Sequence, residues 1–274
     1  MECGKEMSSD KDSIAIILGS AFDQMPTWLS LEARQISTPY GVATLYQMPD
    51  TDPPAYVLFR HGVPHTFLPH QIPYRANAWA LKEVGCCALV VTSSVGLLDQ
   101  NLPLFQPLIV NDLIMLDNRL PDGSTCTMFT EPSETHAHLI ITEGLFSPAL
   151  SSQVAALAEA CKWPVAGEVV FGYVGGPRNK TPAENRIWPK LGAHANSMSL
   201  GPEVVLANEL EIPTAGLVVG HKYSIPGLET ENDNVSLEES FERSRVTFGK
   251  LVVQFLENGR PVPFGNVLYR YASE

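Results

Sequence analysis

Basic charge is scarce in this sequence, and long apolar runs are missing. The 274 residues include 18 lysines and arginines against 30 aspartates and glutamates, which gives a formal net charge of −12. A chain this acidic has no general attraction for nucleic acid or for an anionic membrane surface, so we expect neither as a partner. No apolar run is long enough to cross a bilayer, and the polar first thirteen residues lack the apolar stretch of a signal peptide.

Cysteines are few, and their spacing argues against both a disulfide framework and a metal knuckle. The chain has 5 cysteines, an odd number, and none forms a C-x-x-C pair. Cys86 and Cys87 open the apolar run CCALVV, so we expect buried, reduced thiols that behave as small hydrophobic side chains. This usage is typical of a reducing compartment, and we expect a cytoplasmic protein.

Several well-known motifs are also missing. The sequence contains no G-x-x-x-x-G-K-[ST] and no G-x-G-x-x-G, so it lacks the loops that cradle a nucleoside triphosphate or a dinucleotide. It has no G-x-S-x-G elbow, which disfavours serine hydrolysis, and no H-E-x-x-H pair for zinc.

What the chain does contain is an alternation of strand-like and helical patterns. Short apolar, β-branched runs predict strands at 14–18, 56–59, 88–93, 108–116, 168–174 and 214–219. Helical spacing predicts helices near 74–84, 149–161, 182–191, 202–210 and 236–257, the last with a Ser236–Glu239 capping box and Gly259 as its stop. We therefore expect one α/β domain over 13–274 with a mostly parallel or mixed sheet, after a disordered tail at 1–12. The segment 117–136 is expected to be a long loop.

The stretch FRHGVPHTFLPH at 59–70 concentrates one arginine and three histidines. His61 and His65 have the spacing of two metal ligands on one helical face, but the intervening glycine and proline disfavour a helix. An anion site fits better, because Arg60 and His61 follow a predicted strand at its carboxyl end, where α/β folds bind ligands. The guanidinium group suits phosphate, and His61 could add a donor. On these residues alone, a salt-bridged arginine in a proline-rich surface loop is an equal alternative.

Hydroxyl groups at other predicted strand ends favour the anion site. Ser20 follows the strand at 14–18, Ser93 and Ser94 follow the strand at 88–93, and Ser199 precedes a helix that starts near Pro202. Helix amino termini and clustered hydroxyl groups are natural partners of anions, although each signal alone is common turn chemistry. Together they predict a site of phosphate size.

Four stretches of the sequence resemble one known family, the trimeric purine nucleoside and methylthioadenosine phosphorylases. The stretches are RHGVPHTFLPHQIPYRANAWALKEVGC, VTSSVGLL, GGPRNKTPAENRIWPKLGA and NSMSLGPEVVLANELEIP, and the resemblance runs in order from about residue 14 to residue 256. Within the family, the sequence looks more similar to the methylthioadenosine and methylthioinosine branch.

The resemblance implies a single α/β domain around a twisted, partly barrel-like mixed sheet flanked by helices, usually assembled as a homotrimer. It implies a pentosyltransferase of purine salvage, in which inorganic phosphate attacks the anomeric carbon of a nucleoside and releases the free base. No metal or organic cofactor is implied, and phosphate is the co-substrate.

By motif position, the resemblance implies phosphate binding by Ser20, Arg60, His61, Ser93, Ser94 and Ser199. Met198 is expected to pack on the ribose. The residues implied in catalysis are His61, Ser199 and His221. Glu203, just inside a helix start, is expected to interact favourably with the helix dipole.

The base pocket departs from the family pattern. The positions implied to contact the base are Asn179, Lys180, Glu184, His221, Lys222 and Ser224, where the family offers a phenylalanine, acids and amides. A lysine can only donate hydrogen bonds, so the arrangement that grips adenine is absent. The second glycine of the family's amino-terminal turn is also replaced, by Ala21.

These departures leave several readings open. The chain is expected to cleave a purine nucleoside or 5′-methylthio-purine nucleoside, with a 6-oxopurine as one candidate base for His221 or Lys222. Alternatively, the leaving group is not a common purine, or the chain is a family paralogue that binds phosphate or nucleoside without turnover. Nucleoside hydrolysis by water is a weaker alternative, because it does not need Arg60 together with so many hydroxyl groups.

Overall fold

The computed structural model describes residues 12–20, 22, 31–131, 137–228 and 236–270. Ala21 and the predicted tail up to residue 11 therefore lie outside the described residues. The described residues form two sheets, one large and one of two strands. The strands are β1 Ser13–Leu18, β2 Glu32–Thr38, β3 Gly41–Gln47, β4 Ala55–Phe59, β5 Cys86–Leu97, β6 Pro107–Ile114, β7 Ala137–Ile140, β8 Glu168–Tyr173, β9 Ala195–Ser197, β10 Thr214–Tyr223 and β11 Val267–Arg270.

The large sheet is mixed and closes on itself at one end. Its strand order is β10-β6-β8-β9-β5-β1-β4-β3-β2, and β10 pairs with β5 as well as with β6. The strands β10, β6, β8, β9 and β5 thus form a closed ring, from which β1, β4, β3 and β2 continue as an open wing. Parallel pairing joins β5 to β1 and β10, whereas β9 runs antiparallel to β5. The expected partly barrel-like mixed sheet is confirmed.

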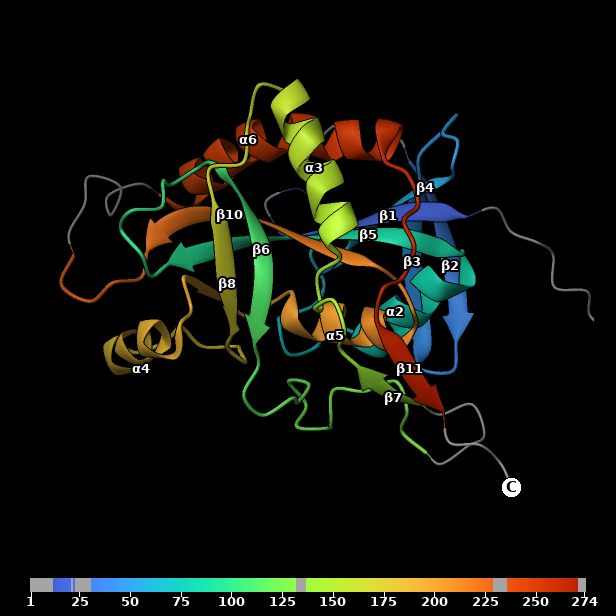
Figure 1. Ribbon diagram of the computed structural model, residues 1–274, viewed down its shortest axis with the longest axis horizontal. Coiled ribbons are helices and arrows are strands. Elements are labelled where there is room, and N and C mark those ends of the chain that lie inside the picture. The colour runs from blue at the N-terminus through green and yellow to red at the C-terminus, as the bar shows by residue number, and fades with distance from the viewer. Residues whose placement is uncertain (1–11, 21, 23–30, 132–136, 229–235, 271–274) are drawn as a thin grey trace, which may run out of the picture.

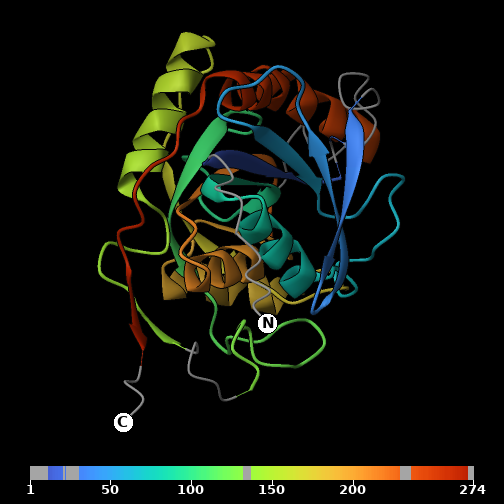
Figure 2. The same ribbon diagram turned by 90° about the vertical axis from the view of Figure 1, so that its right-hand side faces the viewer.

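Helices cover the sheet on two sides (Figures 1 and 2). The helices are α2 Tyr74–Glu83, α3 Pro148–Ala160, α4 Pro182–Ile187, the 3-10 helix η1 Trp188–Leu191, α5 Gly201–Glu209 and α6 Leu237–Asn258. In Figure 1, α3 and α6 lie above the sheet, and α2 and α5 lie together below it. The two-stranded sheet β7–β11 lies at the α5 side of the molecule.

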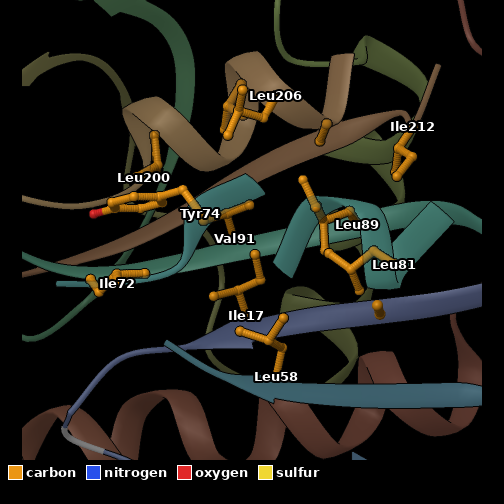
Figure 3. Packing of buried hydrophobic residues seen from close by; sticks show 14 of the residues in the cluster. Ile17, Leu58, Ile72, Tyr74, Leu81, Leu89, Val91, Leu200, Leu206 and Ile212 are labelled. Carbon is orange, nitrogen blue, oxygen red and sulfur yellow. The ribbon is translucent and has the colours of Figure 1, made fainter. Parts of the chain in front are cut away.

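Strand β1 shows why the sequence forms two cores rather than one. Every residue of SIAIIL is buried. Ala15 and Ile17 belong to the cluster that includes the buried side chains of α2 and α5 (Figure 3), whereas Ile14, Ile16 and Leu18 belong to the cluster with α3 and α6. Because successive side chains of a strand point to opposite faces, a continuous apolar run is what a strand covered on both faces requires.

The predicted elements are present, with informative differences. The helix predicted at 236–257 is confirmed as α6, where the Ser236 hydroxyl accepts from the Glu239 N–H at 3.1 Å. The Glu239 carboxylate bonds Arg243 at 2.7 Å. Gly259 ends the helix in an extended conformation. A Cβ there would lie 2.5 Å from the Phe255 carbonyl oxygen, so close packing explains the glycine.

The strand predicted at 88–93 is longer than expected. It continues to Leu97, so Ser93 and Ser94 lie within β5 and not at its end. The hydrogen bonds of the extension are supplied by β10 and β9, since Ser93 pairs with Val218 and Gly96 with Asn196. These neighbours come from distant parts of the sequence, which is why local pattern did not predict the extension.

Candidate active site

A cavity of about 160 Å³ lies where β1 and β4 end beside the longer β5. It is lined by Gly19, Ser20, Arg60, His61, Pro69, Ser93, Ser94, Ser197, Met198 and Ser199. The structure therefore brings together all six residues predicted to bind phosphate, and it places the predicted ribose residue Met198 beside them. Gly19, Pro69 and Ser197 were not among the predicted site residues.

The convergence follows from the parallel strands at the centre of the sheet. Leu18 of β1 is paired with Phe59 of β4, and Ile17 is paired with Val91 of β5. The residues that follow β1 and β4 therefore reach the same level of the sheet as Ser93. The Thr92 hydroxyl donates to the Ile17 carbonyl at 2.8 Å and fixes this register.

Arg60 is held by a buried ion pair. Its Nε donates to Glu203 Oε1 at 2.6 Å, and its Nη2 donates to Glu203 Oε2 at 2.9 Å and to the Thr92 carbonyl at 2.8 Å. The two side chains are 2% and 3% exposed. Nη1 lies beside Gly19, where an added Cβ would approach it to 3.1 Å. Three N–H donors of the guanidinium group, one on Nε and two on Nη2, are therefore used to orient it. The remaining nitrogen, Nη1, lies beside Gly19, which lines the cavity.

Glu203 has a larger role than the helix-dipole interaction predicted for it. Its Oε2 also accepts from the Leu200 N–H at 2.8 Å, at a turn where Leu200 has φ of 69°. A non-glycine residue in this region costs energy, and the Glu203 carboxylate stabilises the turn. The turn carries Met198 and Ser199, so Glu203 connects Arg60 to two other cavity residues. A buried arginine requires a partner, but sequence alone does not say which carboxylate supplies it.

The hydroxyl groups of the cavity form a connected set. Ser93 Oγ and Ser199 Oγ are 2.7 Å apart, and both Ser93 Oγ and Ser197 Oγ donate to the Ser94 carbonyl at 3.2 Å. Hydroxyl groups can donate or accept as they rotate, so this set can present O–H groups to an anion in the cavity.

His61 is held in one orientation by its backbone neighbour. Its Nδ1 lies 2.8 Å from the Phe67 carbonyl, which can only accept, so Nδ1 carries the proton in the neutral ring and Nε2 is an acceptor. Burial, together with the charge of Arg60, lowers the pKa of His61 to about 4. The ring also stacks on His65, with centroids 4.5 Å apart. Within the described ranges, no group of three His, Cys, Asp or Glu side chains could hold a metal ion.

The predicted base residues of β10 lie at the other end of the site. Lys222 pairs with Gly96 and Gly220 with Val95, so His221 is the extra residue of a β-bulge. Bulges often re-aim side chains next to active sites. Ser224 is buried against Gly96, where a Cβ would come within 2.1 Å of its Oγ. Burial, then the charges of Lys222 and Lys180, lower the pKa of His221 to about 4.

The other predicted base residues lie in the turn after β8 and in α4, and two of them have other partners. Glu184 caps α4 by accepting from the Thr181 N–H at 2.7 Å, and it accepts from Arg178 Nη1 and Nη2 at 2.9 and 2.7 Å. The Arg178 hydrogen bonds above all lower the pKa of Glu184 to about 2. Asn179 is exposed, and its carbonyl accepts from Arg178. None of the six predicted base residues lines the cavity, and Asn179 and Glu184 have other partners. Lys180 is half-buried and Lys222 is exposed, and burial, then the charge of Lys222, lowers the pKa of Lys180 to about 8.

Known proteins are similar to this chain in sequence and in fold. The sequence model of the Phosphorylase superfamily matches residues 13–257. A probable S-methyl-5′-thioinosine phosphorylase of Methanopyrus kandleri is 29% identical over 262 residues, which cover 93% of this chain and 97% of the relative. A 6-oxopurine nucleoside phosphorylase of Pyrococcus furiosus is 31% identical over 219 residues, 77% of this chain and 79% of the relative. The structure of a Schistosoma mansoni methylthioadenosine phosphorylase in complex with adenine superposes with a TM-score of 0.78 and 25% identity, covering 90% of this chain and 91% of that one.

Proposed function

The chain belongs to the phosphorylase superfamily, and on that premise we propose that it is a nucleoside phosphorylase acting on a purine nucleoside or 5′-methylthio-purine nucleoside. The products are the free base and ribose 1-phosphate or 5-methylthioribose 1-phosphate. The observation that carries the proposal is the convergence of Ser20, Arg60, His61, Ser93, Ser94 and Ser199 on one cavity.

The reaction requires little covalent chemistry from the protein. A phosphate oxygen forms a bond to the anomeric carbon, the bond from that carbon to the base nitrogen breaks, and its electron pair leaves with the base. Overall, the proton of hydrogen phosphate ends on the base. Catalysis then consists of holding phosphate on one face of the sugar and stabilising charge on the departing base.

The cavity residues suit the first task. Arg60 is pre-oriented by Glu203, so its free edge needs no reorganisation to meet an anion. The Ser93 and Ser199 hydroxyl groups add donors. Neutral His61 offers an Nε2 acceptor, which matches the O–H of hydrogen phosphate. Met198, on the same wall, is assigned to the ribose face. Phosphate is the co-substrate, and no metal or organic cofactor is assigned.

For the second task we assign His221, Lys222, Ser224 and Lys180 to the base. His221 is the candidate catalytic residue at this end, since charge develops on the base as it leaves. Asn179 and Glu184 are not assigned to the base, because their partners lie in the turn before α4.

We propose that the chain assembles as a homotrimer and works in the cytoplasm. The family resemblance supports the trimer, as do the exposed apolar side chains Leu116, Ile140 and Ile141, which are 72%, 41% and 55% exposed. Light scattering tests the trimer against the 29.9 kDa chain mass. The four described cysteines are free thiols, which suits a reducing compartment. No helix in the described part of the chain is long and apolar enough to span a membrane.

The test is release of base from inosine, guanosine, adenosine, methylthioadenosine and methylthioinosine, each with and without phosphate. We expect phosphate-dependent release from at least one of them, and its loss in Arg60→Ala. Arg260→Ala, an exposed arginine outside the cavity, is the matched control and should keep full activity.

Arg60→Ala leaves Glu203 buried without its partner, so it could fail by unfolding. The double variant Arg60→Met/Glu203→Met removes both charges, and such replacements of buried pairs are often neutral or stabilising. A folded but inactive double variant supports the proposal. Release that does not depend on phosphate would indicate a hydrolase, and no release from any nucleoside would contradict the proposal.

A further inference from the structure

Two buried polar atoms near the end of β10 have no hydrogen-bond partner among the described residues. They are Nδ1 of His221 in β10 and Oδ1 of Asn196 in β9, whose residue is fully buried. A Cβ on Gly96 would lie 2.1 Å from Ser224 Oγ and 3.5 Å from Asn196 Oδ1, so both oxygens lie close to Gly96. Buried polar groups are normally hydrogen-bonded, so unpaired ones that cluster indicate a place for a ligand.

This polar cluster is continuous with the phosphate cavity. Ser94 lines the cavity and pairs with Val219, and further along the same two strands Gly96 pairs with Lys222. Two residues of a strand span about 6–7 Å, roughly the width of a nucleoside's sugar. Met198, which lines the cavity, lies against Gly176, and Lys180 follows Gly176 a few residues later in the chain. A nucleoside with its sugar at Met198 therefore directs its base toward the cluster.

The charge at this end is net positive, because Lys180 and Lys222 face a single nearby acid in the described part of the chain, Glu184, whose charge acts on Lys180 less than the charge of Lys222 does. Among the described residues, no carboxylate forms an ion pair with Lys180 or Lys222. The acid next in the chain, Glu184, is taken by Arg178 and Thr181. The two ammonium groups act on each other, because the charge of Lys222, after burial, lowers the pKa of Lys180. Two cations near one acid that is already paired with Arg178 leave a net positive charge, which favours an anion.

The donors match one type of purine edge. In an oxopurine, the 6-oxygen and N7 are adjacent acceptors, and this is the pair that lysine and arginine read in guanine. Adenine replaces that oxygen with an amino group, which a lysine cannot accept from. A second oxygen at position 2 would engage the second lysine, and it also makes the ring acidic, so that xanthine loses a proton near neutral pH.

We propose that Lys222 and Lys180 form a cationic base subsite that selects an acidic 2,6-dioxopurine, with xanthine the best match among common purine bases. The proposal rests on the proposed phosphorolysis and names its substrate class. The same two charges stabilise the base as it departs with the electron pair of the broken bond.

The direct test is titration calorimetry of xanthine, hypoxanthine and adenine into the full-length protein with phosphate present. Wild type is expected to bind xanthine at least about tenfold more tightly than adenine. Lys222→Met and Lys180→Met are each expected to weaken xanthine binding about tenfold, the usual size of a lost hydrogen bond to a charged group, and to leave adenine unchanged. Lys222→Arg, which keeps the charge, should retain most of the preference.

Lys190→Met is the matched control, since Lys190 is an exposed lysine in η1 and its loss changes the net charge equally. It should leave all three affinities unchanged. Equal affinity of wild type for adenine and xanthine would overturn the subsite. So would equal losses for all bases in the lysine variants, because the lysines would then contribute to binding without selecting among the bases.

Turnover of xanthosine, inosine and adenosine, measured in parallel, separates the two proposals. Phosphate-dependent cleavage with no preference for xanthosine would leave the phosphorylase standing and overturn the subsite. Lysine-dependent binding of xanthine without cleavage of any nucleoside would support the subsite and contradict phosphorolysis.

Discussion

Two arginine–glutamate pairs, one at the phosphate cavity and one at the start of α4, differ in burial. At the cavity, Arg60 and Glu203 are 2% and 3% exposed and lie 143 positions apart in the sequence. At the start of α4, Arg178 and Glu184 are 67% and 35% exposed and only 6 positions apart. Both pairs have two short hydrogen bonds, so the contact geometry is alike and the surroundings differ.

The difference shows what each pair can do. A buried pair cannot lose one member without leaving a charge in the interior, so it locks together the elements that carry it. Arg60 follows β4 and Glu203 belongs to α5, and their union fixes the cavity. An exposed pair competes with water and contributes little, so Arg178 and Glu184 shape only the local turn before α4. The buried pair therefore holds the phosphate cavity rigid, whereas the exposed pair has no such effect.

The largest effect on stability is expected from Glu203→Ala. Removal of the carboxylate leaves Arg60 buried without its partner, and we expect the free energy of unfolding to fall by about 3–5 kcal/mol. The KM for phosphate should rise in whatever fraction remains folded, because the guanidinium group is no longer oriented. Urea denaturation and initial rates at varied phosphate measure the two effects.

Glu203→Gln is the control, since it keeps the shape and one acceptor and should lose less stability. If Glu203→Ala unfolds no more easily than wild type, Glu203 does not hold the cavity together.

A smaller effect is expected from Gly96→Ala, at the base end. Its Cβ would approach Ser224 Oγ to 2.1 Å and Ser224 Cβ to 3.0 Å, so the strand or the serine must shift. We expect a loss of about 1–3 kcal/mol in the free energy of unfolding, as for other overpacked sites. The KM for nucleoside should rise while the KM for phosphate stays unchanged.

Ser224→Gly should relieve the clash in a double variant. In the double-mutant cycle of Gly96→Ala and Ser224→Gly, the coupling energy in the free energy of unfolding should therefore be clearly different from zero. Purely additive effects would mean that the strain lies elsewhere.

The pH dependence of stability gives a further test, because His61 and His221 both stay neutral in the folded protein. The pKa values of His61 and His221 are lowered to about 4 from an ordinary 6.5. Between these values, the unfolded chain binds protons that the folded protein does not, so folding stability falls as the pH drops from 6.5 to 4.

Urea denaturation at a series of pH values should show this slope. Each single variant, His61→Asn or His221→Asn, should show a shallower slope than wild type in the same window. An unchanged slope in either variant would mean that its histidine is not kept neutral by the fold.

The smallest effect is expected from Arg178→Met. Its partner Glu184 still caps α4 through Thr181, and the arginine is mostly in water. The melting temperature and the KM for phosphate should not change measurably, in contrast to Glu203→Ala. A large drop in melting temperature would mean that exposed and buried pairs matter equally here.

The phosphate end was predictable from sequence because its residues fall in long, specific motifs next to recognisable strands. Arg60 and His61 follow a buried apolar run, and Ser199 precedes a helix. The extension of β5, the partnership of Arg60 with Glu203 and the roles of Pro69 and Ser197 were not predictable. Each depends on a neighbour far away in the sequence, and local patterns carry no information about it.

At the base end, sequence identified the positions but not their partners. It marked Glu184 for the base, yet the capping pattern Thr181-Pro-Ala-Glu184 is itself a local helix signal that accounts for the carboxylate. The bulge at His221 had no sequence signal, because it arises from unequal pairing between β10 and β5.

By itself, the sequence determined the alternation of strands and helices, the burial of β1 on both faces and the set of side chains suited to bind phosphate. These properties depend on residue type and on spacing over a few positions. Only the tertiary structure decided that β10 closes the ring with β5, that Glu203 orients Arg60, and that Lys180 lies near Lys222. Those outcomes depend on which distant segments share a buried interior, and there the energy of an unpaired charge or an unpaired backbone group selects the neighbours.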